Sequence, residues 1–438
     1  MRDDISAGAS AKVILFIGHL WPEPTSSAAG YRTLALLKAI LNDTTPGENG
    51  AEALWQLHFT SAADKTEFCA DLENMGIISH QIKLNDSSFD AFIKNLKPDV
   101  VFYDRFITEE QFASRVHEHF PNVINILDTQ DLHFLRRARQ HSLKSGQEVD
   151  LYTDDSMREI AAILRCDLSL IISTYEMQLL IEQFKIAPEL LHYCPFMLTL
   201  NEKKNQAKVH QCSFAERKHF VMIGNFLHPP NWDAVLWCYQ AIWPQIRVQL
   251  PQAQVHVYGA YPSEKVWQLH QPDKGFIIKG RARDAIKTLE KYRVNLAPLR
   301  FGAGIKGKIA DGFIAGTPCV TTDIGQEGMA DKLDWGGLVA DRDNATGQQN
   351  EQQIAQYAVD LYQNASLWQS SSQNGKQIIR QQFNESQHAD IFINRLHQLI
   401  NTLPEHRKNN FYGQILRHNL YRSQYFMSKW IEEKNKVK

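Results

Sequence analysis

A rhythm of short apolar runs separated by helical segments is the feature of this chain that most restricts its fold. Continuous apolar runs that end in polar or glycine-containing loops are typical of strands buried in a parallel sheet. The first half contains six such runs, with helical segments such as residues 30–40 between most of them. The runs lie at residues 12–20, 53–61, 78–84, 99–106, 122–131 and 168–174. This alternation predicts parallel strands covered by helices.

The same rhythm begins again at residue 219, after a polar stretch without a clear period at residues 201–218. We interpret that stretch as a linker between domains. Helical patterns cover residues 231–250, with a bend expected at Pro244, and residues 308–315. The apolar runs of this half lie at residues 219–226, 254–260, 275–280, 294–299 and 317–322.

The two halves together predict an α/β protein of two tandem Rossmann-like domains whose parallel sheets face a central cleft. We expect an N-terminal domain at residues 1–205 and a C-terminal, ligand-binding domain at residues 206–385. Parallel-sheet domains bind ligands at the carboxyl ends of their strands. The cleft between the domains is therefore the expected site.

The chain after residue 350 is expected to be helical, and helices at residues 386–438 are expected to pack back on the N-terminal domain. The terminal segment fits an amphipathic helix. Its tail from Pro404 carries eight Lys or Arg and three Glu, which fits a solvated helix face or a weak peripheral contact with anionic lipid. The apolar positions of the helix are Phe411, Ile415, Leu416, Leu420 and Trp430.

Charge and composition exclude several classes of protein. A net charge of −2 gives no electrostatic reason to expect nucleic acid as a partner. No apolar stretch reaches the roughly 18 residues of a spanning helix, and the first residues do not fit a signal peptide. The six cysteines form no C-x-x-C pair, so we expect buried thiols in a reducing compartment. A cytoplasmic location, with at most peripheral contact at the inner membrane face, follows as the expectation.

The strongest local signal is APLRFGAGIKGKIADGFIAGTPCV at residues 297–320. Its glycines let the backbone approach a ligand closely, and the amino-terminus of the following helix favours an anion. Two lysines add point charges for phosphate oxygens, so the loop predicts a diphosphate site, with a surface turn as the alternative. Asp311, one turn into the helix, could accept hydrogen bonds from ribose hydroxyls or simply offset a lysine. The residues concerned are Gly302, Gly304, Lys306, Gly307 and Lys308.

This loop, together with GNFLHPPNWDAVLWCYQAIWP at residues 224–244 and TTDIGQEGM at residues 321–329, resembles the retaining family-four glycosyltransferases of GT-B fold. The resemblance is specific over about residues 219–330 and weaker in the first half. It implies a nucleotide diphosphate sugar as donor, no cofactor and no essential metal. The triplet at residues 341–343, with Asp341 and Asp343, is accordingly not expected to bind a metal.

The resemblance also implies roles for single residues. Of two glutamates that the family often carries, the first is replaced here by Ala303 and the second by Asp311, and Glu327 is a further acid near the same site. The implied donor-binding residues are Gly30, Arg32, Gly224, Asn225, Arg281, Gly302, Gly304, Lys306, Lys308, Asp311 and Glu327, with Gly280 beside Arg281.

Polar residues at strand ends of the first half are candidates for the reacting groups. Asp131 and His133 could bond the sugar or move a proton, and with Asp311 they are the expected catalytic residues. The alternatives are a helix cap for Asp131 and a surface position for His133. Asp128 lies in the same segment, and Asp104 with Arg105 fits a salt bridge as well as a site.

The resulting hypothesis is transfer of a sugar to a glycan, lipid-linked or small-molecule acceptor with retained configuration. Two other functions remain open. A nucleotide-sugar epimerase would share the donor loop and need no separate acceptor. A non-catalytic nucleotide-sugar-binding scaffold would fit the loss of the glutamate at Ala303.

Overall fold

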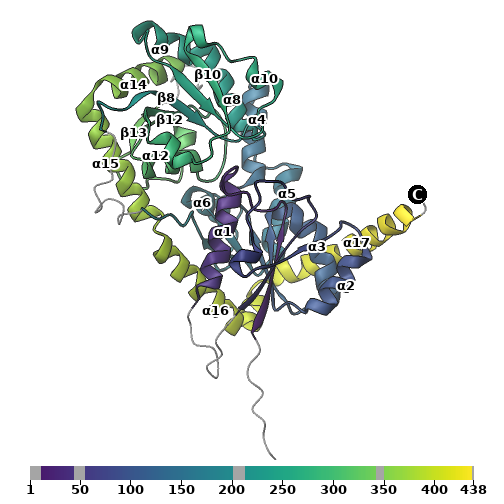
Figure 1. Ribbon diagram of the computed structural model, residues 1–438. Coiled ribbons are helices and arrows are strands. Elements are labelled where there is room, and N and C mark those ends of the chain that lie inside the picture. The colour runs from purple at the N-terminus through teal and green to yellow at the C-terminus, as the bar shows by residue number, and fades with distance from the viewer. Residues whose placement is uncertain (1–10, 44–54, 201–212, 342–349, 437–438) are drawn as a thin grey trace, which may run out of the picture.

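Two parallel sheets, each flanked by helices, make up the protein, and the computed structural model describes residues 11–43, 55–200, 213–341 and 350–436 (Figure 1). The first sheet has seven strands in the order β3-β2-β1-β4-β5-β6-β7, and the second has six in the order β10-β9-β8-β11-β12-β13. Both orders reverse beside their first strand, between β1 and β4 and between β8 and β11. Such switch points are where doubly wound sheets bind ligands. The predicted fold class is confirmed.

The first sheet takes its strands from the first half of the chain. They are β1 (Lys12–Gly18), β2 (Trp55–Ser61), β3 (Ile78–Gln81), β4 (Val100–Asp104), β5 (Ile124–Asp128), β6 (Leu168–Ile171) and β7 (Leu191–Tyr193). The helices are α1 (Ala28–Leu41), α2 (Ser87–Leu96), α3 (Arg105–His119), α4 (His133–Ser145), α5 (Asp154–Arg165) and α6 (Thr174–Glu182), with short 3-10 turns at Glu73–Met75 and Pro188–Leu190.

The second sheet begins after the residues that we interpreted as a linker, of which 201–212 lie outside the described residues. Its strands are β8 (Lys218–Ile223), β9 (Val255–Tyr258), β10 (Phe276–Gly280), β11 (Tyr292–Ala297), β12 (Cys319–Thr322) and β13 (Gly337–Ala340). The helices around it are α8 (Pro229–Trp237), α9 (Trp243–Gln249), α10 (Glu264–Trp267), α11 (Ala285–Leu289), α12 (Gly307–Ile314), α13 (Asp323–Gln326), α14 (Glu351–Gln363) and α15 (Ala365–Gln382), with a 3-10 turn at Pro272–Lys274.

The helical pattern predicted at residues 231–250 is interrupted just before Pro244. A π-helical turn at Cys238–Ile242 separates α8 from α9, and Pro244 then stands in the first turn of α9. Proline has no backbone N–H to donate, so it is tolerated at a helix start and not in a helix interior. The irregular turn therefore lies just before the proline, which stands where a helix start tolerates it.

The chain crosses back to the first domain after α15. Leu198 and the residues Phe383 and Glu385 exchange two backbone hydrogen bonds, of 2.7 and 3.1 Å. Helix α16 (Glu385–Asn409) then packs against α1 and buries Phe392 and Leu396 in the core that contains Phe16. Helix α17 (Phe411–Lys436) lies along α3 and α5 and runs on past them (Figure 1).

Side chains fill both cores without a cross-link among the described residues. Phe16 is fully buried and stacks between Phe59 and Phe102, at 5.4 Å from each ring. Burial of one such side chain stabilises a fold by about 1.5–3 kcal/mol. Five cysteines are free thiols, and all but Cys69 are buried. The sixth, Cys212, lies outside the described residues, as does Asp343 of the acidic triplet.

Candidate functional site

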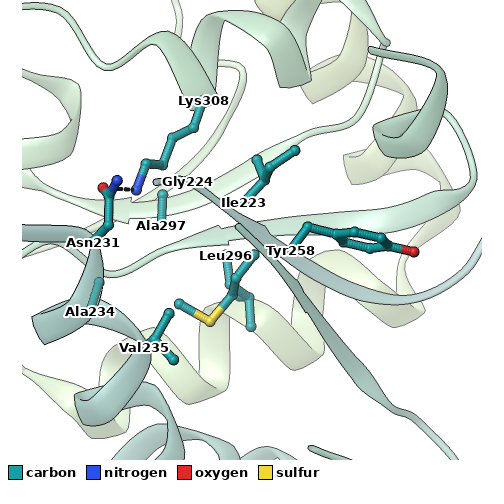
Figure 2. Close-up of a pocket in the computed structure, with 10 residues that line it drawn as sticks. Ile223, Gly224, Asn231, Ala234, Val235, Tyr258, Leu296, Ala297 and Lys308 are labelled. Carbon is teal, nitrogen blue, oxygen red and sulfur yellow. Dashed lines mark hydrogen bonds between the residues drawn. The ribbon is translucent and has the colours of Figure 1, made fainter. Parts of the chain in front are cut away.

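A pocket lies at the switch point of the second sheet, where β8 and β11 end (Figure 2). Its polar side consists of Asn231, from the start of α8, and Lys308, from the start of α12. The Nζ atom of Lys308 donates a 2.5 Å hydrogen bond to the Oδ1 atom of Asn231. The remaining lining residues are mostly apolar: Met222, Ile223, Gly224, Ala234, Val235, Tyr258, Leu296 and Ala297.

Gly224 and Lys308 are in close contact across this pocket. A Cβ atom on Gly224 would lie 2.7 Å from the Nδ2 atom of Asn231 and 3.1 Å from the Nζ atom of Lys308. Burial lowers the pKa of Lys308 to about 8. Only a residue without a side chain fits beside this amine, so Gly224 keeps the backbone of β8 within reach of the cation.

Helix α12 begins at the pocket without a side-chain cap. Its N-cap residue is Lys306, whose side chain makes no capping hydrogen bond. In contrast, the Oγ atom of Ser27 caps α1 by accepting from the Gly30 amide at 3.0 Å. Uncapped amides and the positive end of the helix dipole favour an anion. The arrangement of α12 and Lys308 can hold a phosphate group.

The two lysines of the loop point to different places, although the sequence suggested a pair. The Nζ atom of Lys306 donates to the Gly304 carbonyl at 2.6 Å, and its side chain is buried. Burial lowers the pKa of Lys306, while Glu327 and Glu176 favour its charged form. Lys306 thus stabilises the turn and faces the first domain, whereas Lys308 faces the pocket.

The glycine loop is held against the first domain by two carboxylates. Oε1 of Glu176, on α6, accepts from the amides of Gly304 and Leu132, at 2.8 and 2.9 Å. Burial raises the pKa of Glu176 to about 7, and the charge of Asp131 adds to the increase. Glu327 forms a bidentate ion pair of 2.9 and 2.7 Å with Arg139 of α4.

Arg139 also ties the loop to α4. Its guanidinium donates to the Gly302 carbonyl at 2.8 Å. The carboxylate of Glu327 is therefore engaged in an ion pair between the domains. Ala303 packs against the core of the first domain. No local sequence pattern pointed to Glu176 or Arg139.

Asp131 and His133 lie next to this loop, at the strand ends of the first sheet. The Nε2 atom of His133 is 3.2 Å from an Oδ1 atom of Asp131, and Arg136 binds the other oxygen. Burial works against ionisation of Asp131, but Arg136 and His133 outweigh it and hold its pKa well below the usual range. Burial lowers the pKa of His133, although the negative charge of Asp131 acts to raise it.

The helix-cap alternative for Asp131 is not what the structure shows. The cap position of α4 is Leu132, and Glu159 accepts from the amides of His133 and Phe134 at 3.2 and 2.9 Å. The side chain of Asp131 is thus left facing the glycine loop, where its Cβ atom would be 2.8 Å from a Cβ atom on Gly304.

Arg32 does not point toward the loop, which corrects the expectation that it lies behind Gly30 at the diphosphate. It is 1% exposed, and its Nε atom donates to the Oδ1 atom of Asp128 at 2.9 Å. It also donates to the carbonyls of Cys194 and Pro195. Arg32 and Asp128 thus form a buried structural pair. Gly30 does serve close packing, because a Cβ there would be 2.5 Å from the Glu23 backbone.

Two further candidates, Asn225 and Arg281, contact the first domain. Asn225 approaches the Ser26 carbonyl at 3.5 Å, and Arg281 donates to the Thr25 hydroxyl at 2.5 Å. The guanidinium of Arg281 also stacks over Phe68, at 3.8 Å from the ring centroid. These contacts also join the two domains.

Asp311 is half-buried on α12. Burial raises its pKa to about 7, with Asp284 adding to the effect. No ion pair joins it to Lys308 in the described residues.

Strain marks the strand ends of the first sheet. Arg105 has a φ of +71° and Gln130 a φ of +63°. Residues other than glycine rarely adopt these backbone conformations. Asp104 accepts from the His19 amide at 3.0 Å and from Arg105 at 3.1 Å. Strained backbone held by such contacts is concentrated at functional sites. His19, which the sequence did not single out, therefore joins Asp104 and His133 at this edge.

Comparison with known proteins finds a family model that matches about a third of the chain. Residues 217–364 match the family described as Glycosyl transferases group 1, a segment that contains the whole second sheet. No curated protein matches the chain.

Similar solved structures share the two-domain arrangement. Sucrose-phosphate synthase from Thermosynechococcus elongatus is 12% identical, with a TM-score of 0.65 over 89% of this chain and 100% of that one. HepE from Anabaena, in complex with UDP and glucose, is 13% identical, with a TM-score of 0.63 over 88% and 99%. A glycosyltransferase from Rickettsia africae is 11% identical, with a TM-score of 0.59 over 90% and 99%. The chain therefore has the GT-B fold.

Proposed function

We propose that this chain is a glycosyltransferase that moves a sugar from a nucleotide diphosphate sugar to an acceptor with retention of configuration. The observation that carries the proposal is the pocket where Lys308, Asn231 and Gly224 meet at the uncapped start of α12. The family match of the second domain and the complexes of HepE with UDP and UDP-glucose support the choice of donor. No cofactor enters this chemistry.

The leaving diphosphate is the group that needs stabilisation in such a reaction. Negative charge builds on it as the glycosidic bond breaks, and preorganised donors there lower the barrier. In the proposal, Lys308 and the first amides of α12 are the donors that stabilise the negative charge of the leaving diphosphate. The remaining loop glycines, Gly302 and Gly304, keep the backbone close to the phosphates. Asp311 accepts hydrogen bonds from the ribose hydroxyls. Arg281 and Asn225 contact the nucleotide.

The acceptor enters from the first domain in this proposal. Asp131 and His133 face the loop at the strand ends, close to where the sugar would be transferred. The bond from the anomeric carbon to the diphosphate breaks, the bond to the acceptor oxygen forms on the same face, and the acceptor proton passes to the leaving phosphate. A glycan or a lipid-linked sugar is the acceptor class we propose.

Nucleotide binding tests the donor site directly. We expect UDP to bind more tightly than GDP, ADP or dTDP by calorimetry, and Lys308→Ala to weaken it at least about tenfold, since a charge-assisted contact contributes about 1.5–3 kcal/mol. Lys287→Ala, a 72% exposed lysine of the same domain, is the matched control and should change nothing. Failure of all four nucleotides to bind at millimolar concentration would contradict the site. Binding without turnover would favour the scaffold function.

The pH dependence of the same binding follows from Lys308. Its pKa of about 8 makes it charged below that pH, and a bound diphosphate favours the charged form. Binding must therefore take up a proton above pH 8, and UDP affinity should fall by about tenfold per pH unit there. Lys308→Arg keeps the charge and should remove this decline. An identical decline in Lys308→Arg would assign it to another group.

A further inference from the structure

Helix α17 packs on the first domain with its polar side inward. Its buried residues are Gly413, Arg417, Tyr421, Ser428 and Glu432. Arg417 donates to Asp167 at 2.7 Å, and the Tyr421 hydroxyl donates to Glu109 at 2.6 Å. Charged and hydroxyl groups, and not an apolar stripe, thus form most of its contact with α3 and α5.

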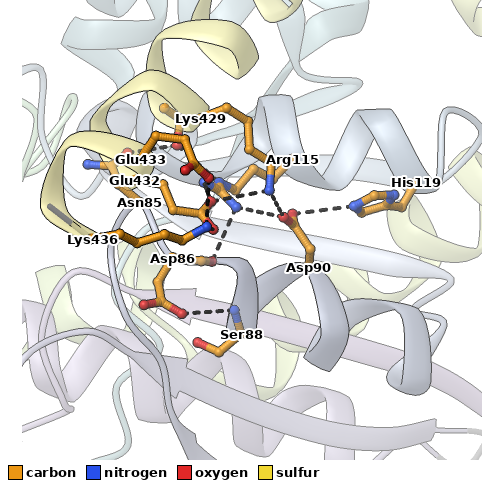
Figure 3. Close-up of polar contacts among 11 residues, drawn as sticks. Asn85, Asp86, Ser88, Asp90, Arg115, His119, Lys429, Glu432, Glu433 and Lys436 are labelled. Atoms are coloured by element: carbon orange, nitrogen blue, oxygen red, sulfur yellow. Dashed lines mark hydrogen bonds and ion pairs between the residues drawn. The ribbon is translucent and has the colours of Figure 1, made fainter.

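The end of the helix is fastened by an ion-pair cluster around Arg115 of α3 (Figure 3). Arg115 contacts Asp90 at 2.7 Å and Glu432 at 3.1 Å, and its Nε atom donates to the Ser428 hydroxyl at 3.0 Å. Lys429 reaches Asp90 as well, at 2.7 Å. Leaving a buried charge of this kind without its partner costs several kcal/mol of stability. The cluster therefore holds the helix in one rotation about its axis.

The outward side of α17 carries large apolar residues. At about 100° per residue, these positions lie opposite the buried ones. Tyr412 is 77% exposed and Trp430 is 62% exposed. The full set is Phe411, Tyr412, Ile415, Phe426, Met427 and Trp430, which we name the outward face. Packing within the chain does not account for this face.

Positive charge accompanies the outward face. Residues 411–436 contain five Lys or Arg and two Glu. Of the five, Arg417 and Lys429 form ion pairs with the first domain, and Lys436 pairs with the glutamates of the helix itself. Arg422 and Lys434 are exposed and form no ion pair within the described residues. Lys434 stands over the Trp430 ring, at 5.1 Å from its centroid. Aromatic and apolar side chains bordered by basic ones are typical of helices that lie in a membrane interface.

We infer that the outward face of α17 docks on a lipid surface with anionic headgroups. Within the described residues no helix combines the length and apolarity that crossing a bilayer requires, so the helix would lie along the surface. Its 26 residues span roughly 39 Å, enough for the apolar side chains to enter at both ends while Arg422 contacts headgroups between them. A second copy fits less well, because the same face would offer Arg422 and Lys434 mainly like charge, whereas anionic headgroups can pair with both.

Flotation of the full-length protein with vesicles tests this inference. We expect the wild type to float with vesicles of equal parts phosphatidylcholine and phosphatidylglycerol, and to do so at least about tenfold less with pure phosphatidylcholine or in high salt. A triple variant, Phe426→Ser with Met427→Ser and Trp430→Ser, should lose most of the binding. Arg422→Gln with Lys434→Gln should lose only the preference for anionic lipid.

The control is Val248→Ser, which removes an 83% exposed apolar side chain from the second domain and should float like the wild type. UDP binding of each variant reports that it is folded. A wild type that stays unbound at both lipid compositions, or a triple variant that floats equally well, would overturn the inference. A dimer in sedimentation that the triple variant abolishes, without vesicle binding, would overturn it in favour of a second copy.

Discussion

Replacement of Asp128 by Ala is expected to destabilise the first domain by about 3–5 kcal/mol, because it leaves a buried guanidinium without its counter-charge. Asp128 is completely buried, and Arg32, 1% exposed, has no solvent to replace the lost partner. The remaining contacts of Arg32 are backbone carbonyls, which carry no formal charge. Urea unfolding followed by tryptophan fluorescence at neutral pH measures the loss.

The matched control is a similar pair at the surface. Glu110 binds Arg158 through two hydrogen bonds, of 3.1 and 2.6 Å, but Arg158 is 48% exposed. Glu110→Ala should therefore cost about 1 kcal/mol or less, since water replaces the lost carboxylate. Equal shifts in the two variants would show that burial of the Arg32–Asp128 pair adds nothing to stability.

The fold was predictable because its strands are buried on both faces. Such strands are continuous apolar runs, so β1, β4 and β5 stand out from the polar loops around them. Strand β7 was not predicted, because its three residues, Leu191–Tyr193, are too short to form a pattern. The predicted run at residues 99–106 ends early, because Arg105 turns directly into α3.

The site was predictable only where its residues are neighbours in sequence. Gly302, Gly304 and Lys308 form one local motif, so the sequence alone could single out this loop as a candidate. Glu176 is 128 residues from Gly304, and Arg139 is 188 residues from Glu327, so no local pattern could pair them. The direction of a side chain was equally out of reach: Arg32 was expected to bind the donor, whereas its side chain is buried against Asp128.

Helix α17 shows the same limit for a whole element. Its periodicity indicated an amphipathic helix, and that much is correct. Periodicity does not tell which face is inward. Ion pairs with Arg115, Asp90 and Asp167 decide that, and those partners lie more than two hundred residues earlier in the chain.

Gly304→Ala is expected to weaken UDP binding at least about tenfold, because it disturbs the loop in two ways that add up to more than 1.4 kcal/mol. Gly304 has a φ of +64°, which costs a residue with a Cβ about 1–2 kcal/mol. The new Cβ would also lie 2.8 Å from the Cβ atom of Asp131 and 3.3 Å from Ile172. The loop must move off the first domain to relieve this contact, which breaks the hydrogen bond from the Gly304 amide to Glu176.

Gly146→Ala separates the two contributions. Gly146 has a φ of +71° at the end of α4, and a Cβ there would meet nothing within 4 Å. It should therefore lose about 1–2 kcal/mol of stability from backbone strain alone and keep its UDP affinity. Calorimetry with UDP and small-angle scattering, which reports separation of the domains, would be made on both variants. Opening and weak binding in Gly304→Ala alone would tie nucleotide affinity to the contact between the glycine loop and the first domain. Unchanged binding in Gly304→Ala would mean that Lys308 and the start of α12 hold the diphosphate without that contact.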